Sequence, residues 1–497
     1  MFFLQDTSCL SSQEKNVITD GQFTCPYSKI LGVFEYIRSL FEERKIDITD
    51  CVALECDNSV LNVLVLLFLL ENGYRFLLLS KGVQSAQSMM SVPPSIPSFC
   101  RYRIRVESLN DNGKGSGLEH LDRILLISAN EQWVDCEAAR GILYLQTSGS
   151  TGVPKIVVHS HAKLRENALN CVQRFGLSYE DRVTIPVPIY HMYGLGAALL
   201  PSLAVGASID LQKGTNLLRY LQREREFESN VAFVTPAFCE TLAKGRKSPR
   251  LYKLTVAAGD RIREDTFSRY EAKCGCLVKL YGSTEMGAIA AGSPDEAMEI
   301  RLQQVGLPMS GVQIRVEPSA TVSPNPLLDY SQKMGELWCY HPAGFNGYVD
   351  RAGLPIQSHP DFQEYWFRTK DLGQLEPDGR LTVLGRCDRS VNRDGLLVPF
   401  CEVEQAIETL AGIESVIVEA QGESPRGKGL VAYCVLTQET TLSEVEIRNI
   451  CFNILPKYAI PDRVVILNAF PLLQNGKVDR QKLISMTAAD AMNLARG

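Results

Sequence analysis

The sequence has no hydrophobic run long enough to cross a bilayer. Its most apolar stretch, Val60 to Leu70, contains Asn62 and stops at Glu71, whereas a membrane span needs roughly 20 apolar residues. The N-terminus also lacks the basic region and the apolar core of a secretion signal. We therefore expect a soluble, cytoplasmic protein with no membrane span.

Basic residues are not in excess. The chain has 51 Lys and Arg residues against 57 Asp and Glu residues, which gives a net charge of −6. Because no surplus of positive charge is available to neutralise a phosphate backbone, a nucleic-acid partner is not expected. A local basic patch for one nucleotide is still compatible with this charge.

The 15 cysteines include no C-x-x-C pair. Cys274 and Cys276 are separated by one residue, a spacing that suits tetrahedral zinc poorly. Others, such as Cys434 and Cys451, lie in apolar patterns. These features predict buried free thiols in a reducing compartment.

With 497 residues, the chain is too long for one compact core, so two or more domains are expected. Apolar runs that alternate with helical patterns predict parallel α/β sheets with ligands at the strand ends. The pattern predicts a buried helix over Val60–Leu70. It also predicts strands over Tyr74–Leu79, Ile142–Gln146, Ile156–His159, Val231–Thr235, Leu254–Ala258 and Val278–Tyr281.

The pattern changes near Gly385 to Asp388, so we expect domains over 1–386 and 387–497, the second a small α+β domain. Pro399 is expected to open a helix that runs through Glu404 and Ile407. Ser443 and Glu446 form a capping box before a second helix. The remaining predicted elements are a strand pair, Ser415–Glu419 and Leu430–Leu436, around a loop from Gly422 to Gly429.

The stretch from Thr147 to Lys155 combines four hydroxyls, two glycines and a lysine in nine residues. Glycines let backbone N–H groups turn inward to form a concavity that binds anions, and Lys155 adds positive charge. A P-loop is excluded because Gly-x-x-x-x-Gly-Lys-Ser/Thr is absent. From these residues alone, a polyphosphate loop and an ordinary turn between two strands are both open.

Three later strings carry similar chemistry. Tyr281 to Glu285 joins an aromatic ring, a glycine, hydroxyls and a carboxylate that could stack a base and hold magnesium. Asp371 could accept hydrogen bonds from both ribose hydroxyls. The string from Pro471 to Arg480 contains Lys477. Each string alone is also compatible with a turn or a basic surface loop.

In their order from Tyr144 to Arg480, these strings resemble the adenylate-forming superfamily. It includes acyl- and aryl-CoA synthetases, luciferases and the adenylation domains of nonribosomal peptide synthetases. The resemblance covers essentially the whole chain and implies a large N-terminal domain of mixed β-sheets with helices, plus a small C-terminal α+β domain that rotates about a hinge at Asp388. Two positions depart from the family pattern: Lys370 replaces a usual glycine, and Val383 a frequent aromatic residue.

The resemblance implies roles for individual residues. Tyr281 would flank the adenine, Thr284 would contact the α-phosphate, and Glu285 would bind Mg²⁺. Lys477 would enter the active site to neutralise charge during adenylation, and Gly395 would line the channel for the pantetheine arm. Catalytic roles are implied for Lys477, Thr151, Glu285 and His191. ATP contacts are implied for Thr147, Ser148, Gly149, Ser150, Gly152, Lys155, Gly259, Asp260, Tyr281, Gly282, Ser283, Thr284, Asp371 and Arg386.

The acid pocket is expected around Pro188 to Leu195. No Asp or Glu occurs between Val183 and Ser208, so the ammonium of an amino acid would lack its usual partner there. We therefore expect an acyl or aryl acid. His191 would gate the site or orient the carboxylate, or else be a buried histidine among apolar neighbours. The expected apolar lining is Tyr190, Tyr193, Val234 and Phe238.

The predicted reaction is ATP-dependent formation of acyl-AMP, followed by transfer to a phosphopantetheine thiol. The acceptor is CoA or a carrier protein. Asn475 to Arg480 looks like members that serve carrier proteins, whereas the pocket string looks like CoA ligases. Few residues follow Arg480, so we expect any carrier to act in trans. An amino-acid-adenylating domain and an inactive nucleotide-binding scaffold are the alternatives.

Overall fold

The computed structural model describes residue 4 and the ranges 15–81, 96–107, 125–136, 139–147, 155–213, 216–317, 334–356, 362–363, 365–393, 396–424, 427–437, 440–471 and 478–486. Contacts divide the chain into two units. The first comprises Met1–Ile314, Cys339–Phe367 and Gly379–Leu381, and the second comprises Arg315–Trp338, Arg368–Asp378 and Thr382–Gly497. The domain boundary expected after residue 386 stays a prediction.

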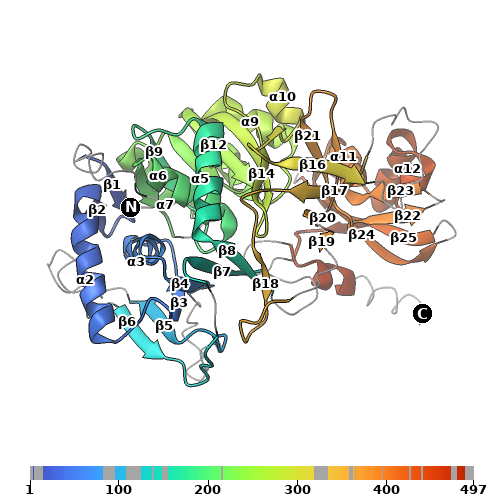
Figure 1. Cartoon of the computed structure of the whole chain (residues 1–497). Helices are drawn as coiled ribbons and strands as arrows, with labels where there is room; N and C mark the ends of the chain where they lie inside the picture. Colours follow the sequence, from blue (N-terminus) through green and yellow to red (C-terminus); the bar gives the residue numbers. More distant parts are fainter. Residues whose placement is uncertain are drawn as a thin grey trace. The chain divides into compact units, whose positions relative to one another are not determined.

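One seven-stranded sheet of the first unit carries the ends of the predicted phosphate loop (Figure 1). Its strand order is β18-β8-β7-β4-β3-β5-β6. The strands are β3 (Cys51–Cys56), β4 (Arg75–Ser80), β5 (Tyr102–Val106), β6 (Leu125–Ala129), β7 (Ile142–Gln146), β8 (Ile156–Ser160) and β18 (Gly347–Val349). The central pairs are parallel, while β8 is antiparallel to both β7 and β18. The strands predicted on both sides of the glycine-rich stretch are confirmed.

A nine-stranded sheet of the same unit has the order β15-β14-β13-β12-β11-β9-β10-β1-β2. Its strands are β1 (Val17–Thr19), β2 (Thr24–Pro26), β9 (Arg182–Ile185), β10 (Ser208–Leu211), β11 (Val231–Val234), β12 (Tyr252–Ala258), β13 (Gly275–Ser283), β14 (Gly287–Ala291) and β15 (Leu307–Pro308). From β13 to β1 all neighbours are parallel, and antiparallel strands complete both edges. The predicted parallel α/β architecture is confirmed.

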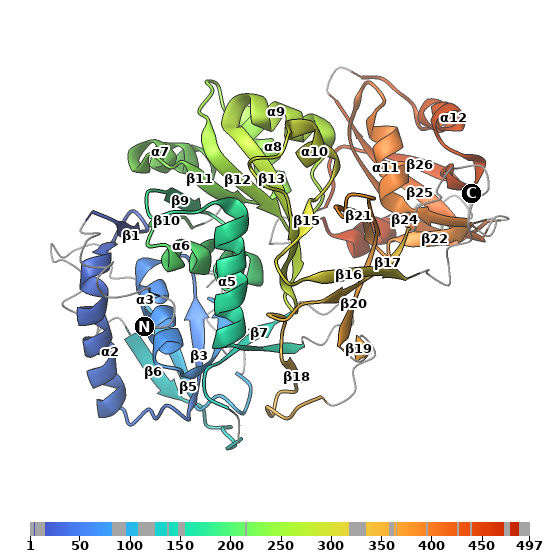
Figure 2. The ribbon, with the colours of Figure 1, turned by 45° about the horizontal axis from the view of Figure 1, so that its top comes forward.

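Helices pack on and between these sheets. They are η1 (Tyr27–Lys29), α2 (Ile30–Glu43), α3 (Val60–Glu71), α5 (His161–Phe175), the π-helical η2 (Tyr193–Leu199), α6 (Leu200–Ala204), α7 (Leu217–Phe227), α8 (Pro236–Gly245), α9 (Glu264–Cys274) and α10 (Met298–Gln303). Every residue from Val60 to Leu70 is buried, as expected for a helix that is apolar on all sides. Helix α5 contacts β8 of one sheet and β14 of the other, and so links them (Figure 2).

The second unit contains a smaller sheet, β23-β22-β25-β24, with β26 beside β25. Its elements are β22 (Ser390–Arg393), β23 (Leu396–Pro399), α11 (Phe400–Glu408), β24 (Ile413–Ser424), β25 (Gly427–Leu436), α12 (Glu444–Ile454), η3 (Lys457–Ala459) and β26 (Arg463–Leu467). The helix after Pro399 and the Ser443–Glu446 capping box are confirmed. The predicted loop from Gly422 to Gly429 is too long, because the two strands of the hairpin extend into it.

A fourth sheet comprises β16 (Gln313–Glu317), β17 (Gly335–Tyr340), β19 (Phe362–Gln363), β20 (Trp366–Leu375) and β21 (Leu381–Arg386). The chain passes between the units within β16, β17, β20 and β21, and also between Asp378 and Gly379. Within the described ranges, no helix combines the length and apolar character that a bilayer crossing requires. The cysteines in those ranges are free thiols, and most of them are buried, as predicted.

Candidate active site

The ends of the predicted phosphate loop, Thr147–Lys155, are fixed by the β7–β8 pair. Gln146 pairs with Ile156, and one residue further on the Thr147 amide donates to the Lys155 carbonyl over 3.0 Å. This hydrogen bond closes the hairpin at the base of the loop. The predicted contacts Ser148, Gly149, Ser150, Thr151 and Gly152 lie outside the described residues, and their roles stay predictions.

The residues Tyr281–Glu285, which we call the nucleotide segment, lie at the carboxyl end of β13. The neighbouring strand β12 is parallel, with Ala258 paired to Leu280, so Gly259 and Tyr281 follow at the same sheet edge. Ligands of parallel sheets bind at such edges. Gly259 and Asp260 are exposed there.

A tight turn follows the nucleotide segment. Within it, the Met286 amide donates to Ser283 Oγ over 3.0 Å. Gly282 is needed for this return of the chain, because a Cβ at this position would lie 2.2 Å from the Gly287 carbonyl oxygen. The geometry of the turn alone therefore requires glycine at position 282. The contact of Gly282 with a phosphate stays a prediction.

Tyr348 connects two of the predicted site residues. Its hydroxyl donates to Glu285 Oε1 over 2.9 Å, and Lys155 Nζ lies 5.2 Å from the centroid of its ring, a cation–π distance. The Tyr348 side chain is buried, and its ring packs edge-on against Phe345. The structure thus places Lys155 and Glu285, two of the predicted site residues, on the same tyrosine.

The residues around Glu285 fit a magnesium ion that a nucleotide brings with it. A hard cation needs several oxygen ligands, and Mg²⁺ commonly takes one or two carboxylates while phosphates and water supply the rest. In the described ranges no group of three His, Cys, Asp or Glu side chains gathers to hold a metal. Glu285 would therefore hold the ion together with nucleotide oxygens.

Three histidines near this region are buried. Burial lowers the pKa of His159, His161 and His341 to about 4 in each case, so all three rings are neutral at physiological pH. Nε2 of His159 lies 2.7 Å from the Thr284 carbonyl oxygen. This contact joins β8 directly to the nucleotide segment.

The predicted acid-pocket string folds back on itself. A Cβ at Gly194 would lie 2.2 Å from the Pro188 carbonyl oxygen, so only glycine fits. His191 is exposed, and its ring lies 4.6 Å from that of Tyr190. The interpretation of His191 as a buried histidine is therefore wrong, whereas its predicted role at the acid stays open.

The expected apolar lining has further structural contacts. The Tyr193 hydroxyl lies 3.0 Å from the Val234 carbonyl oxygen and 2.7 Å from that of Val256. Val234 and Phe238 are buried in a cluster beneath α8 and α9. Tyr193 is thus anchored to β11 and β12, which fixes the π-helical turn at the edge of the nine-stranded sheet.

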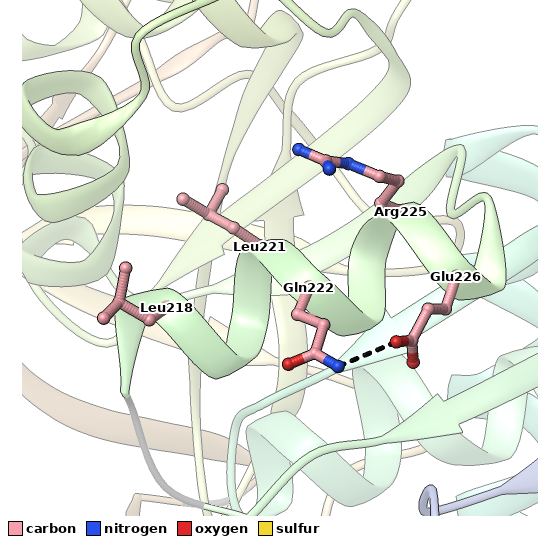
Figure 3. Close-up of a pocket in the computed structure, with 5 residues that line it drawn as sticks. All are labelled: Leu218, Leu221, Gln222, Arg225 and Glu226. Carbon is pink, nitrogen blue, oxygen red and sulfur yellow. Dashed lines mark hydrogen bonds between the residues drawn. The ribbon is translucent and has the colours of Figure 1, made fainter.

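A surface hollow lies elsewhere, on α7 (Figure 3). One helix supplies its whole lining, and within it Gln222 Nε2 donates to Glu226 Oε1 over 2.8 Å. Leu218 is 79% exposed at its edge. The lining is Leu218, Leu221, Gln222, Arg225 and Glu226, so this hollow is separate from the predicted site residues.

The second unit holds the predicted ribose and hinge residues. Arg386 Nη1 lies 3.6 Å from Asp371 Oδ1, and Arg386 Nε lies 3.4 Å from Asp388 Oδ1. One guanidinium thus joins Asp371, whose side chain is 16% exposed, to the exposed Asp388. Gly395 and Lys477 lie outside the described residues, and their roles stay predictions.

The backbone before Asp371 is unusual. Lys370 has φ = +64°, in the left-handed region that favours glycine. Its carbonyl accepts a hydrogen bond from the Cys387 amide over 2.8 Å, which ties this residue to the chain just before Asp388, the predicted hinge.

Sequence reasoning missed His159 and Tyr348 as contributors to the site. His159 lies on β8, four residues after Lys155, and Tyr348 lies on the three-residue strand β18. Their partners lie 125 and 63 residues away in the chain, so local patterns carry no signal for these contacts.

Comparisons with known proteins agree with this fold. The family model described as AMP-binding enzyme matches residues 103–349, and that of the AMP-binding enzyme C-terminal domain matches residues 402–477. The chain is 25% identical over 359 residues to 2-succinylbenzoate–CoA ligase of Enterococcus faecalis, with 71% of each chain covered. It is 24% identical over 491 residues to indoleacetate–CoA ligase of Aromatoleum aromaticum, with 93% of each covered.

A solved structure has the same fold. ATP-bound MatB from Rhodopseudomonas palustris aligns with a TM-score of 0.78 at 23% identity, over 98% of both chains. At this identity the likeness concerns the fold alone.

Proposed function

Because the chain belongs to the AMP-binding enzyme family, we propose that it activates an acyl or aryl carboxylic acid with ATP and transfers the acyl group to a thiol. The observation that carries this proposal is the contact of Lys155 and Glu285 with the same Tyr348 ring and hydroxyl. These contacts support the proposal because they keep the ammonium group of Lys155, which would attract phosphates, near the carboxylate of Glu285, which would bind Mg²⁺.

The reaction has two steps. A carboxylate oxygen of the acid attacks the α-phosphorus of ATP, and pyrophosphate leaves with the electrons of the broken P–O bond. A thiol sulfur then attacks the acyl carbon, and AMP leaves. Lys155 would attract the phosphates, and a Mg²⁺ ion at Glu285 would supply further positive charge when bound.

Lys477, Asp371 and Asp388 have proposed roles in the second unit. Lys477 would neutralise the charge that develops on the α-phosphate during the first step, a task suited to a compact charge on a long stem. Asp371 would bind the ribose hydroxyls. Asp388 would serve as the hinge about which the C-terminal domain rotates, so that Gly395 meets the pantetheine arm in the second step.

The acid is proposed to be acyl or aryl rather than an α-amino acid. The absence of Asp and Glu between Val183 and Ser208 supports this choice, because a buried ammonium needs a partner. The names of the two ligases above, which act on 2-succinylbenzoate and indoleacetate, also favour it. His191 is exposed and so accessible to the substrate carboxylate.

The thiol is proposed to be that of CoA, because both relatives are CoA ligases. A carrier protein acting in trans is a second candidate, and the string from Asn475 to Arg480 favours it. The free, mostly buried cysteines of the described ranges suit a reducing compartment, which supports the proposed cytoplasmic location.

Pyrophosphate exchange tests the first step. Purified protein with Mg·ATP is assayed against fatty acids, aryl acids and amino acids, and we expect exchange with acids of the first two classes. Exchange with amino acids alone would favour an amino-acid-adenylating domain. Tight ATP binding without exchange for any acid would favour a nucleotide-binding scaffold.

The variant Lys477→Ala tests the proposed catalytic lysine. It should lower the rate of exchange roughly 10²- to 10³-fold, as the loss of other preorganised charge-stabilising donors does. Lys482→Ala is the matched control, because Lys482 is an exposed lysine only five positions further along. Equal rates for both variants would refute the role of Lys477.

A further inference from the structure

His159 joins the strand that leaves the phosphate loop to the nucleotide segment. It lies on β8, four residues after Lys155, and its side chain is 1% exposed. Its Nε2 lies 2.7 Å from the carbonyl oxygen of Thr284, the residue expected at the α-phosphate. The two strings that would hold the nucleotide are therefore connected through one buried side chain.

The residues Phe345–Tyr348, which we call the bridging segment, make the same connection a second time. The Phe345 amide donates to the Glu285 carbonyl over 2.8 Å, and the Asn346 amide donates to the Val158 carbonyl over 2.6 Å. Lys163 Nζ donates to the Phe345 carbonyl over 3.2 Å. The nucleotide segment is thus linked to β8 directly at Thr284 and, through the bridging segment, to β8 and α5 at Glu285.

The bond at Thr284 fixes the protonation of His159. A carbonyl oxygen only accepts hydrogen bonds, so the neutral imidazole must carry its proton on Nε2. Nδ1 is then an acceptor, and it is buried with no hydrogen-bond partner among the described residues. The second ring nitrogens of His161 and His341 are in the same situation, so the contact with Thr284 is what distinguishes His159.

We propose that His159 is a positioning residue that holds Thr284, and with it the adjoining Glu285, in place relative to β8, the strand that begins after Lys155. Its contribution to the reaction rests on the proposed function, whereas the hydrogen bond to Thr284 does not. Loss of this bond removes the direct contact of Thr284 with β8, while the bridging segment still holds Glu285. The predicted α-phosphate contact at Thr284 can then shift relative to the predicted metal-binding carboxylate of Glu285. The bound nucleotide would then be misaligned rather than repelled.

His161 provides a matched control two residues further along. It is also buried, at 5% exposure, and its Nδ1 lies 3.2 Å from the Leu70 carbonyl oxygen at the end of α3. Its ring packs on Phe76 of the seven-stranded sheet. His161 therefore shares the chemistry and burial of His159 but is anchored away from the nucleotide segment.

The decisive comparison uses amides of different reach. In His159→Gln the side-chain nitrogen can occupy a position near that of imidazole Nε2 and still donate to Thr284, whereas in His159→Asn it is too short. We expect His159→Asn to lower kcat/KM for ATP in pyrophosphate exchange roughly 10- to 100-fold and His159→Gln to retain most of it. His161→Asn and His161→Gln should lower Tm while changing kcat/KM less than about threefold.

Equal kcat/KM values for His159→Gln and His159→Asn, measured below the Tm of both, would overturn the proposal. A second readout does not need turnover: the rise in Tm caused by Mg·ATP should shrink for His159→Asn and persist for the His161 variants. If the wild type exchanges pyrophosphate with no acid, the proposed function fails, but this thermal shift still decides the role of His159.

A spectroscopic test requires no variant to fold with full activity. The chain has six histidines, so the NMR spectrum of a selectively ¹⁵N-histidine-labelled sample contains few signals. The signal that is missing from the spectrum of His159→Gln is assigned to His159. We expect that signal to show a neutral ring protonated at Nε2. A ring protonated at Nδ1 would exclude donation to Thr284 and overturn the proposal.

Discussion

Three buried histidines should make the first unit sensitive to mild acid. The side chains of His159, His161 and His341 are 1%, 5% and 6% exposed, and burial lowers the pKa of each to about 4. In the unfolded chain each pKa returns to about 6.5. Above that value both states are neutral, so these residues cause no pH dependence there.

As the pH falls below about 6.5, the unfolded chain takes up protons that the folded unit refuses. The free energy of unfolding therefore falls between about pH 6.5 and pH 4 and is constant below both pKa values. At pH 5 each histidine lowers it by about 2 kcal/mol relative to pH 7.5. Three such histidines together lower the free energy of unfolding by about 6 kcal/mol, which is comparable to the whole free energy of unfolding of a typical domain.

His161→Gln tests this reasoning because it removes one titrating ring outside the nucleotide segment. Urea unfolding is followed at pH 7.5 and pH 5 for wild type and variant, and hydrogen exchange of peptides from β8 and α5 assigns the transition to the first unit. The variant is expected to be less stable at both pH values. Its loss of stability between them should be smaller by about 2 kcal/mol. If the free energy of unfolding falls equally between pH 7.5 and pH 5 in both proteins, His161 does not have the lowered pKa on which this prediction depends.

Tyr348→Phe should raise KM for Mg·ATP about tenfold, because a hydrogen bond to a charged carboxylate contributes roughly 1.5–3 kcal/mol. An unchanged KM in the exchange assay would show that the hydrogen bond from Tyr348 to Glu285 has no role in nucleotide binding. In urea unfolding, the free energy of unfolding of Lys370→Gly should be about 1 kcal/mol higher than that of Lys370→Ala. Both variants lack the lysine side chain, and only glycine adopts φ = +64° without strain. Equal free energies of unfolding would contradict this expectation. Gly287→Ala should cost about 1–3 kcal/mol, because its φ is +65° and the new Cβ would lie 2.5 Å from Asn167 Oδ1; a Tm equal to wild type would show that the site adapts.

The strands and helices could be predicted where one physical signal dominates. Helix α3 is apolar on every side, and only a core position tolerates that pattern. The capping box of α12 has its two partners three residues apart, so the sequence itself contains the whole interaction. The pattern also gave the β7 and β8 ranges, but their antiparallel pairing depends on the loop between them.

The sequence motifs that carry the candidate site residues could be predicted, but the contacts between those motifs could not. Glu285 and Lys155 were found because each sits in a distinctive run of glycines and hydroxyls. Tyr348, which connects them, sits in a short and unremarkable strand. His159 and His161 are two positions apart and equally buried, and only the distant partners Thr284 and Leu70 distinguish their roles.

Lys370 shows why a departure from a family pattern must be analysed through the backbone. The position before Asp371 is left-handed, and its carbonyl accepts a hydrogen bond from the Cys387 amide. This backbone conformation is the one that favours glycine. A lysine that adopts the same φ keeps the Asp371 backbone in the same path, with its amide donating to Thr369 Oγ1 over 3.1 Å. The substitution therefore costs local strain while leaving Asp371 and its partner Arg386 in place, so it is no argument against a ribose contact at Asp371.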